Sequence, residues 1–379
     1  MQIPFNKPFM VGNELEYIKE AHQNRHLAGD GKFTSLCSNW LAEQTGTKKA
    51  LLTHSCTAAL ELSAILANIE PGDEVILPSF TFVSTANAFV LRGAVPVFVD
   101  IRFDTKNIAE TKIEEAITAR TKAIVPVHYA GVACEMDTIL EIAQRYGLLV
   151  IEDAAQAIMS TYKGRALGSI GSLGCLSFHE TKNIISGEGG ALLVNDTNLI
   201  ERAEIVREKG TNRTQFFRGQ VDKYTWCDLG SSYLPGELIA AFLWAQMEEA
   251  REITRRRLGI WQQYQAFFEK FERSDLLSRP IIPKDCVHNA HMYYLLLPSL
   301  EVRTAFMAIM RKRGVSSVFH YVPLHSSPAG RKYGRISGDM AVTDEVSDRL
   351  IRLPLWIGLD KNMDLLFEQI EYVLAELSS

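Results

Sequence analysis

The segment LLVIEDAAQ, residues 148–156, decides the fold that the sequence predicts. Its apolar half is typical of a β-strand buried on both faces, and that strand ends at Asp153. A second apolar run ends in SFHETK, residues 177–182, and the glycine-rich GEGG, residues 187–190, follows closely. Ligands of open α/β sheets bind beyond the carboxyl ends of the strands. Both segments therefore bring polar side chains, Lys182 among them, to one edge of a sheet.

Working outward, the first two thirds of the chain alternate apolar runs with amphipathic helical stretches. Helices are predicted over 57–67, 112–117, 135–145 and 199–208. Strands separated by helices indicate a mainly parallel sheet that is covered on both faces, which is an α/β fold. Seven runs are predicted to form this sheet: 49–55, 74–79, 95–101, 123–129, 148–154, 174–179 and 190–195.

The pattern changes near Glu237, where a long helical stretch over 237–271 begins. A chain of 379 residues exceeds one compact core of ordinary size. We expect a large domain over 1–245 and a smaller α+β domain over 246–379 that includes the long connecting helix. The smaller domain is predicted to contain strands 291–297 and 315–321 and helices 304–314, 343–350 and 363–377.

The composition limits the classes of function. With 47% hydrophobic and 22% charged residues, the chain is typical of a soluble globular protein. A net charge of −5 offers no basic face for nucleic acid, so an anionic ligand has to be held by local groups. The six cysteines form no CxxC pair, and neither a metal site nor a redox motif is expected. We see no signal peptide and no membrane-spanning run, so we expect a cytoplasmic protein without a membrane partner.

Asp153 and Lys182 together suggest a pocket for pyridoxal 5′-phosphate (PLP). The lysine amine would form a Schiff base, and the carboxylate would keep the pyridinium nitrogen protonated so that the ring accepts electrons. Gln156, one helical turn beyond Asp153, would hydrogen-bond the phenolic oxygen of the cofactor. Each residue also has an ordinary interpretation: a helix-capping aspartate, an exposed lysine and a solvated glutamine.

Two further segments complete the predicted pocket. SCTAAL, residues 55–60, joins a strand to a helix, and backbone amides at a helix start bind phosphate, with the Thr57 hydroxyl as a further donor. Ser177 ends another apolar run and would also donate. Phe82 follows a third strand, where its ring would stack on a planar ligand. The alternatives are an ordinary helix N-cap and a phenylalanine of the hydrophobic core.

Two polar segments keep open interpretations. His320, in HYVPLH (320–325), would contact substrate or assist proton transfer, or would be a structural histidine beside a proline turn. The charged stretch 207–213 and the later Arg218 would form a loop that grips phosphate, or a solvated run of charge.

Six motifs in this order resemble the DegT/DnrJ/EryC1/StrS family of PLP-dependent nucleotide-sugar aminotransferases over essentially the whole chain. The resemblance implies PLP-dependent transferase fold type I, which is aspartate aminotransferase-like, and a homodimer with shared active sites at the interface. The motifs are GDG (29–31), SCTAAL (55–60), PGDEVI (71–76), TFVSTANA (81–88), EDAAQ (152–156) and SFHETK (177–182).

The resemblance also implies roles for single residues. It places the catalytic Schiff-base lysine at Lys182, and it implies PLP contacts from Asp153, Gln156, Cys56 (backbone), Thr57, Ser177 and Phe82. We expect substrate contacts from Gly29, Asp30, His320 and Tyr321. The chain departs from the family at GSSY, residues 230–233, because Ser232 replaces the asparagine that usually reaches the partner's cofactor phosphate.

Three longer stretches resemble the branch of the family that makes dTDP-4-amino-4,6-dideoxygalactose for enterobacterial common antigen. That resemblance implies dTDP-4-keto-6-deoxyglucose as acceptor and L-glutamate as amino donor. Alternatives are amination at sugar C3, a UDP-linked sugar, and a non-catalytic sugar-nucleotide binding protein. A related dehydratase branch has histidine in place of Lys182, so the lysine argues against it. The stretches are VHYAGVACEMD (127–137), REKGTNR (207–213) and QFFRGQVDKYTW (215–226).

Overall fold

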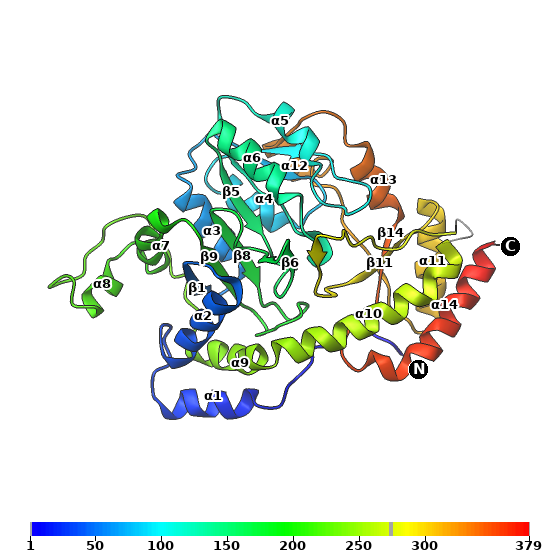
Figure 1. Cartoon of the computed structure of the whole chain (residues 1–379), viewed down its shortest axis with the longest axis horizontal. Helices are drawn as coiled ribbons and strands as arrows, with labels where there is room; N and C mark the ends of the chain where they lie inside the picture. Colours follow the sequence, from blue (N-terminus) through cyan, green and yellow to red (C-terminus); the bar gives the residue numbers. More distant parts are fainter. Residues whose placement is uncertain (1, 273–275, 379) are drawn as a thin grey trace.

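The computed structural model describes residues 2–272 and 276–378, and it is built on a central sheet of eight strands (Figure 1). The strand order across the sheet is β1-β9-β8-β5-β4-β2-β3-β13. All seven predicted strands belong to it, which confirms the predicted α/β class; the two-residue strand β13 was not predicted. The strands are β1 (Lys49–Thr53), β2 (Glu74–Pro78), β3 (Val95–Val99), β4 (Thr121–Ile124), β5 (Leu149–Asp153), β8 (Leu173–Ser177), β9 (Gly190–Val194) and β13 (Arg335–Ile336).

The sheet is mainly parallel, as predicted, and β9 runs against its two neighbours. Strand β9 pairs with β8 in a register that places Ser177 opposite Gly190. A Cβ added at Gly190 would lie 2.4 Å from the Cys56 nitrogen, so only glycine allows this close approach of β9 to the start of the next helix. The connection from β8 to β9, residues 178–189, carries Lys182 at the carboxyl edge of the sheet.

Helices cover both faces of the sheet because each strand alternates its side chains between them (Figure 1). Leu52 packs into the core on one face, and its neighbour Leu51 packs into the core on the other. The first face is covered by α2 (Lys32–Thr45), α6 (Met136–Tyr146) and α9 (Glu237–Glu248). The second face is covered by α3 (Cys56–Leu66), α4 (Val83–Val90) and α7 (Ile200–Arg207).

The C-terminal part forms a third core around an antiparallel sheet in the order β11-β14-β12. Ile351 and Leu353 of β14 both belong to this core. Strand alternation therefore turns Arg352, between them, to the opposite face. The elements of this part are α10 (Ala250–Glu272), α11 (Leu300–Lys312), α14 (Met363–Ser378), β11 (Tyr293–Leu296), β12 (Val318–Phe319) and β14 (Leu350–Leu353).

Several predicted element boundaries in this part are wrong. The stretch 237–271 is not one helix, because α9 ends before Glu249 and α10 begins at Ala250. The strand predicted over 315–321 is reduced to β12, and Leu350, predicted as helical, begins β14. In each case the local pattern gave the type of element, and tertiary packing set its length.

Two chain segments cross the predicted domain boundary. Ile3 pairs with Val315 and packs in the C-terminal core. Strand β13 joins the large sheet beside β3, where Arg335 donates hydrogen bonds of 2.9 and 2.7 Å to Glu74. The division into 1–245 and 246–379 stays a prediction, and residues 1, 273–275 and 379 within it lie outside the described residues.

The remaining elements are short or peripheral. Helix α1 packs against α9 at the edge of the molecule, and the segment with α8 projects from its body (Figure 1). They are α1 (Glu14–Gln23), α5 (Ile113–Ala116), α8 (Arg213–Phe217), α12 (Pro328–Tyr333), α13 (Ala341–Arg349), β6 (Thr161–Tyr162), β7 (Arg165–Ala166), β10 (Cys286–Val287), and the 3-10 helices η1 (Glu110–Lys112), η2 (Tyr129–Gly131), η3 (Thr197–Leu199) and η4 (Leu359–Asn362).

Candidate active site

A cavity of about 360 Å³ lies where the carboxyl edge of the large sheet meets the C-terminal part. Its size is typical of a site for a small molecule. Nine of the residues predicted for the site line this one cavity: Cys56, Thr57, Phe82, Asp153, Gln156, Ser177, Lys182, His320 and Tyr321.

Asp153 is the last residue of β5, and its carboxylate is almost fully buried. The Thr85 hydroxyl donates to one oxygen at 2.7 Å, and the Ala155 amide donates to the other at 3.2 Å. Thr81 holds Thr85 in turn through a hydroxyl contact of 2.9 Å. These bonds hold the carboxylate in one orientation at the wall of the cavity, where it can pair with a cationic group of a ligand.

Glu152, the residue before it, fixes the end of β5 from behind. Its carboxylate accepts hydrogen bonds from the amides of Gly168, Ile170 and Gly171 at 2.6–2.8 Å. The fourth donor is His128 Nε2, at 2.8 Å, because His128 Nδ1 accepts from the Cys134 amide. Both side chains are fully buried. This network positions the loop after β7 against the strand that carries Asp153.

Lys182 lies in the connection between β8 and β9, and its backbone amide donates to the His179 carbonyl. Burial lowers the pKa of its amine, while the Cys56 thiol and the Asp153 carboxylate partly oppose this effect. A lowered pKa increases the fraction of free amine at neutral pH. The geometry thus gives a nucleophilic amine and a buried carboxylate in the same cavity.

The start of α3 supplies backbone donors to the cavity. Ser55 caps this helix by accepting the Ala58 amide at 3.1 Å. The amides of Cys56 and Thr57 have no acceptor within the described part of the chain, and both residues line the cavity. Free amides at the start of an eleven-residue helix are a site for phosphate. Ser177 and the Thr57 hydroxyl, which contacts Ser84 at 2.9 Å, lie in the same wall.

Gln156 connects this wall to an aromatic group from the C-terminal part. Its Oε1 accepts the Ala130 amide at 2.7 Å, and its Nε2 donates to the Tyr321 hydroxyl at 3.0 Å. The His320 Nδ1 lies 3.0 Å from the hydroxyl of Tyr129. Burial strongly lowers the pKa of His320, so its imidazole is neutral near neutral pH. His320 and Tyr321, the two predicted substrate residues of the C-terminal part, both line the cavity.

Phe82 lies at the rim of the cavity at the start of α4, with 59% of its surface exposed. It is therefore not a residue of the hydrophobic core. A large exposed ring at the mouth of a cavity is available to a planar ligand. Its stacking on PLP stays a prediction.

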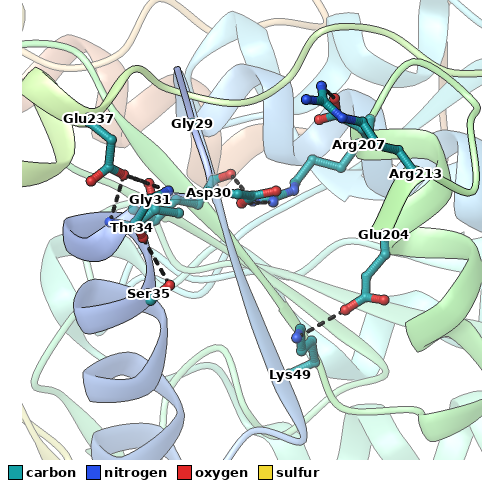
Figure 2. Close-up of polar contacts among 12 residues, drawn as sticks. Gly29, Asp30, Gly31, Thr34, Ser35, Lys49, Glu204, Arg207, Arg213 and Glu237 are labelled. Atoms are coloured by element: carbon teal, nitrogen blue, oxygen red, sulfur yellow. Dashed lines mark hydrogen bonds and ion pairs between the residues drawn. The ribbon is translucent and has the colours of Figure 1, made fainter. Parts of the chain in front are cut away.

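Gly29 and Asp30 do not line the cavity. Asp30 forms an ion pair with the buried Arg207, as Figure 2 shows. A Cβ on Gly29 would lie 2.7 Å from the Pro235 carbonyl, and one on Gly31 would meet the Glu237 carboxyl group. The GDG motif is thus explained by close packing against residues 234–237. A substrate role for Gly29 and Asp30 stays a prediction.

The cations of the charged stretch are paired with carboxylates of the same chain. Lys209 and Arg213 both contact Glu208, and Arg218 makes two hydrogen bonds to Glu204 (Figure 2 shows Arg213 and Glu204). Ser232, on the exposed segment next to them, pairs with Glu208 and lies outside the cavity of its own chain. The ion pairs of these cations with Glu208 and Glu204 favour a structural role for the charged stretch over a role as a loop that grips phosphate.

Several polar residues of the cavity wall were not predicted from the sequence, among them Ser84, Thr85, Arg257, His291 and Arg352. Ser84 and Thr85 lie in the motif TFVSTANA, so a signal was present. Arg257, His291 and Arg352 come from the C-terminal part, where no motif marks them. They approach Lys182 only because the chain folds back, so tertiary structure alone reveals them.

In residues 2–272 and 276–378, no helix is both long and apolar enough to cross a membrane. The same residues contain no group of three or more histidine, cysteine or acidic side chains placed to hold a metal ion.

Comparisons with known proteins agree with this geometry. The uncharacterized protein MJ1066 of Methanocaldococcus jannaschii is 40% identical over 332 residues, which are 86% of this chain and 84% of that protein. The spore coat polysaccharide biosynthesis protein SpsC of Bacillus subtilis is 33% identical over 98% of this chain and 97% of its own. The crystal structure of the aminotransferase TlmJ from Streptoalloteichus hindustanus superposes with a TM-score of 0.90 and 30% identity over the whole of both chains.

A match to one family extends over nearly the whole chain, from residue 9 to residue 377. The solved structures that are similar to this chain have the type I fold of PLP enzymes, which confirms the predicted fold. The chain therefore belongs to the DegT/DnrJ/EryC1/StrS aminotransferase family, whose members depend on PLP.

Proposed function

We propose that this protein transfers the amino group of L-glutamate to the C4 ketone of dTDP-4-keto-6-deoxyglucose. The product would be dTDP-4-amino-4,6-dideoxygalactose, for enterobacterial common antigen or a related surface polysaccharide. One observation carries the transaminase chemistry: Lys182, Asp153 and the two free amides of α3 line the same cavity. The choice of sugar rests on the stretches 127–137, 207–213 and 215–226, and the polysaccharide role of SpsC supports the wider class.

The donor set of the cavity fits PLP. The buried Asp153 carboxylate suits the protonated ring nitrogen, and the free amides of Cys56 and Thr57 suit the phosphate. Ser177 and the Thr57 hydroxyl would add phosphate contacts, and Gln156 would reach the phenolic oxygen. Bound PLP supplies an electron sink that stabilises negative charge at the carbon next to the reacting nitrogen.

Lys182 performs the proton transfers in this proposal. With its pKa lowered by burial, the amine takes the proton from the α-carbon of L-glutamate. In the second half of the reaction, the same side chain delivers a proton to C4 of the sugar. Asp153 would hold the ring nitrogen of the cofactor in both halves, and His320, whose imidazole is neutral, and Tyr321 would contact the substrate from the C-terminal part.

A homodimer with shared sites is part of the proposal. The segment with α8 projects from the body of the molecule and exposes apolar rings, with Phe217 at 70% and Trp226 at 78% exposure. Exposed apolar surface of this kind is typical of an interface. The loop 230–233 directly follows this segment, and in this proposal Ser232 of the partner subunit approaches the cofactor phosphate.

The experiment is product identification with purified protein, PLP and L-glutamate. The acceptor panel contains the dTDP- and UDP-linked 4-keto sugars and a dTDP-linked 3-keto sugar, and mass spectrometry with NMR identifies the amino sugar. We expect amination of dTDP-4-keto-6-deoxyglucose at C4 with the galactose configuration. Preferential amination at C3 or of the UDP sugar supports the alternative within the family. Binding of sugar nucleotide without any amination supports the non-catalytic alternative.

A further inference from the structure

Arg352 is a cation without an acidic partner in the wall of the cavity. It lies on β14 with its side chain turned away from the C-terminal core. Its Nε is buried and has no hydrogen-bond partner, and no ion pair joins its guanidinium group to any described residue. Its ring contact is with Phe5, whose centre lies 4.8 Å from the guanidinium carbon. The ring of Phe5 holds the guanidinium group from one side. The nitrogens of this group have no acceptor among the described residues.

Other cationic and neutral groups surround it, and no free carboxylate does. The electrostatic effects of Arg352 reach Lys182, His291 and His320. Arg257, also in the wall, donates to the carbonyls of Ala290 and His291 at 3.1 and 2.8 Å. The acidic residues that line the cavity are Asp153 and Glu188. Asp153 is held on the large-domain wall by Thr85, and the side chain of Glu188 is 71% exposed and near His179.

An uncompensated cation inside a cavity is costly in an empty protein and indicates an anionic ligand. The guanidinium group presents a planar set of donors, which matches a carboxylate through two parallel hydrogen bonds. The cofactor phosphate has its own donors at the start of α3, on the large-domain side of Lys182. The anion at Arg352 is therefore a second one, on the side of the C-terminal part.

The two substrates that carry an anion differ in how far that anion lies from the reacting atom. Resting on the proposed function, the α-carboxylate of the amino donor is bonded to the carbon whose proton Lys182 removes. It must therefore lie close to Lys182, and Arg352 lines the same cavity as Lys182. The phosphates of a sugar nucleotide are attached at C1, across the sugar ring from the C4 ketone, and lie farther from the reacting atom.

We propose that Arg352 binds the α-carboxylate of the amino donor and so selects an amino acid as the donor. The contact to Phe5 holds the guanidinium group in place, and Arg257 adds positive potential beside it. Carboxylate binding at this position also places the α-carbon of the donor within reach of Lys182.

The test compares Arg352→Gln with Arg303→Gln in the PLP-loaded enzyme. Arg303 is a matched control: its Nε is also buried without a partner, it lies over Phe319, and it does not line the cavity. Stopped-flow absorbance measures conversion of the loaded enzyme by L-glutamate alone. Reaction of the amino form of the enzyme with the keto sugar is measured separately. Calorimetry measures the binding of glutarate, a dicarboxylate that has no amine to react.

We expect Arg352→Gln to raise the KM for L-glutamate roughly a hundredfold, as for removal of one partner of a buried charge-assisted pair. Glutarate binding should weaken in parallel, while the reaction with the keto sugar should stay near that of the Arg303→Gln control. Arg352→Lys, which keeps the charge without the planar fork, should restore part of the affinity.

Two results would overturn the assignment. One is equal glutamate KM and equal glutarate affinity in Arg352→Gln and Arg303→Gln. The other is a loss confined to the keto-sugar reaction, which would place the sugar nucleotide at Arg352. If the wild-type enzyme transaminates no amino acid, the proposed function fails instead. A difference in glutarate binding between the two variants would still identify Arg352 as a carboxylate site.

Discussion

Asp153 shows how neighbouring groups fix the carboxylate of one residue at the wall of the cavity. Thr85 and the Ala155 amide hold its two oxygens, and Glu152 anchors the strand end behind it. The protein itself therefore holds the carboxylate in one orientation. Fixed charge of this kind is usually the largest contribution that a protein makes to a reaction.

Replacing Asp153 with asparagine should remove this charge and keep the size of the side chain. We expect the Asp153→Asn protein to fold and to retain PLP, but to transfer protons roughly a thousandfold more slowly or worse. Single-turnover kinetics with L-glutamate measure the rate, and the absorbance of the cofactor measures its occupancy. Near-normal turnover of the loaded variant would rule out this role for Asp153.

Some residues of the site could be predicted from the sequence, and others could not. Asp153 and Lys182 were predicted because each follows an apolar strand, and strand ends of a parallel sheet share one edge. Arg352 carries no such signal, since it lies between apolar residues of a short strand in a distant part of the chain. Gly29 and Asp30 show another limit of a motif: packing against residues 234–237 explains its glycines, and the substrate role stays a prediction.

At the scale of elements, Glu74 of β2 joins the last strand of the sheet to the strands before it. Arg335, Thr118 and Arg120 donate to its buried carboxylate. These bonds, those of Arg335 above all, lower the pKa of Glu74 from 4.5 to about 2. A carboxylate with a lowered pKa stabilises the folded state above its unfolded pKa, and that stabilisation is lost as the pH falls toward 2.

Glu74→Gln should therefore destabilise the protein by about 2 kcal/mol near neutral pH, an amount already reduced for the partial exposure of Arg335. The difference from the wild type should narrow as the pH falls from 4.5 toward 2. Urea unfolding at several pH values measures both quantities, with Glu141→Gln on the surface of α6 as control. A pH-independent difference would mean that packing, not the charge, is responsible.

The start of α3 yields a second prediction at this scale. The Thr57 and Ser177 hydroxyls would each give a charge-assisted bond to the cofactor phosphate. We expect the double variant Thr57→Val, Ser177→Ala to lose PLP far more readily than Ser232→Ala. The single change at Ser232 should cost about 1 kcal/mol or less. Dialysis followed by cofactor assay decides this. Equal loss from both proteins would show that the partner loop matters more than the helix start.

The type of each long element was predictable, and its ends often were not. The seven predicted strands of the large sheet stand out because they are apolar on both faces. The break at Glu249 between α9 and α10 has no proline or glycine to announce it, and β14 begins directly after α13. Packing of the C-terminal part against the large sheet sets these boundaries, and a local pattern does not contain that information.

At the scale of the whole molecule, the projecting segment with α8 is the feature that a single chain does not explain (Figure 1). Its rings are exposed, and the loop with Ser232 follows it directly. We expect the protein to sediment as a homodimer. Trp226→Ser should weaken the dimer, whereas Leu91→Ser, at an exposed leucine on the body of the molecule, should not. A fully active monomer would refute the shared site.

The most direct test of the central claim is to locate the covalent attachment of the cofactor. The PLP-loaded protein is reduced with borohydride and digested, and mass spectrometry identifies the peptide that carries the reduced cofactor. We expect the added mass on Lys182. It should be absent from a Lys182→Ala protein and present in a Lys209→Ala control. Cofactor fixed to another lysine, or still fixed in Lys182→Ala, would contradict the assignment of this cavity as the active site.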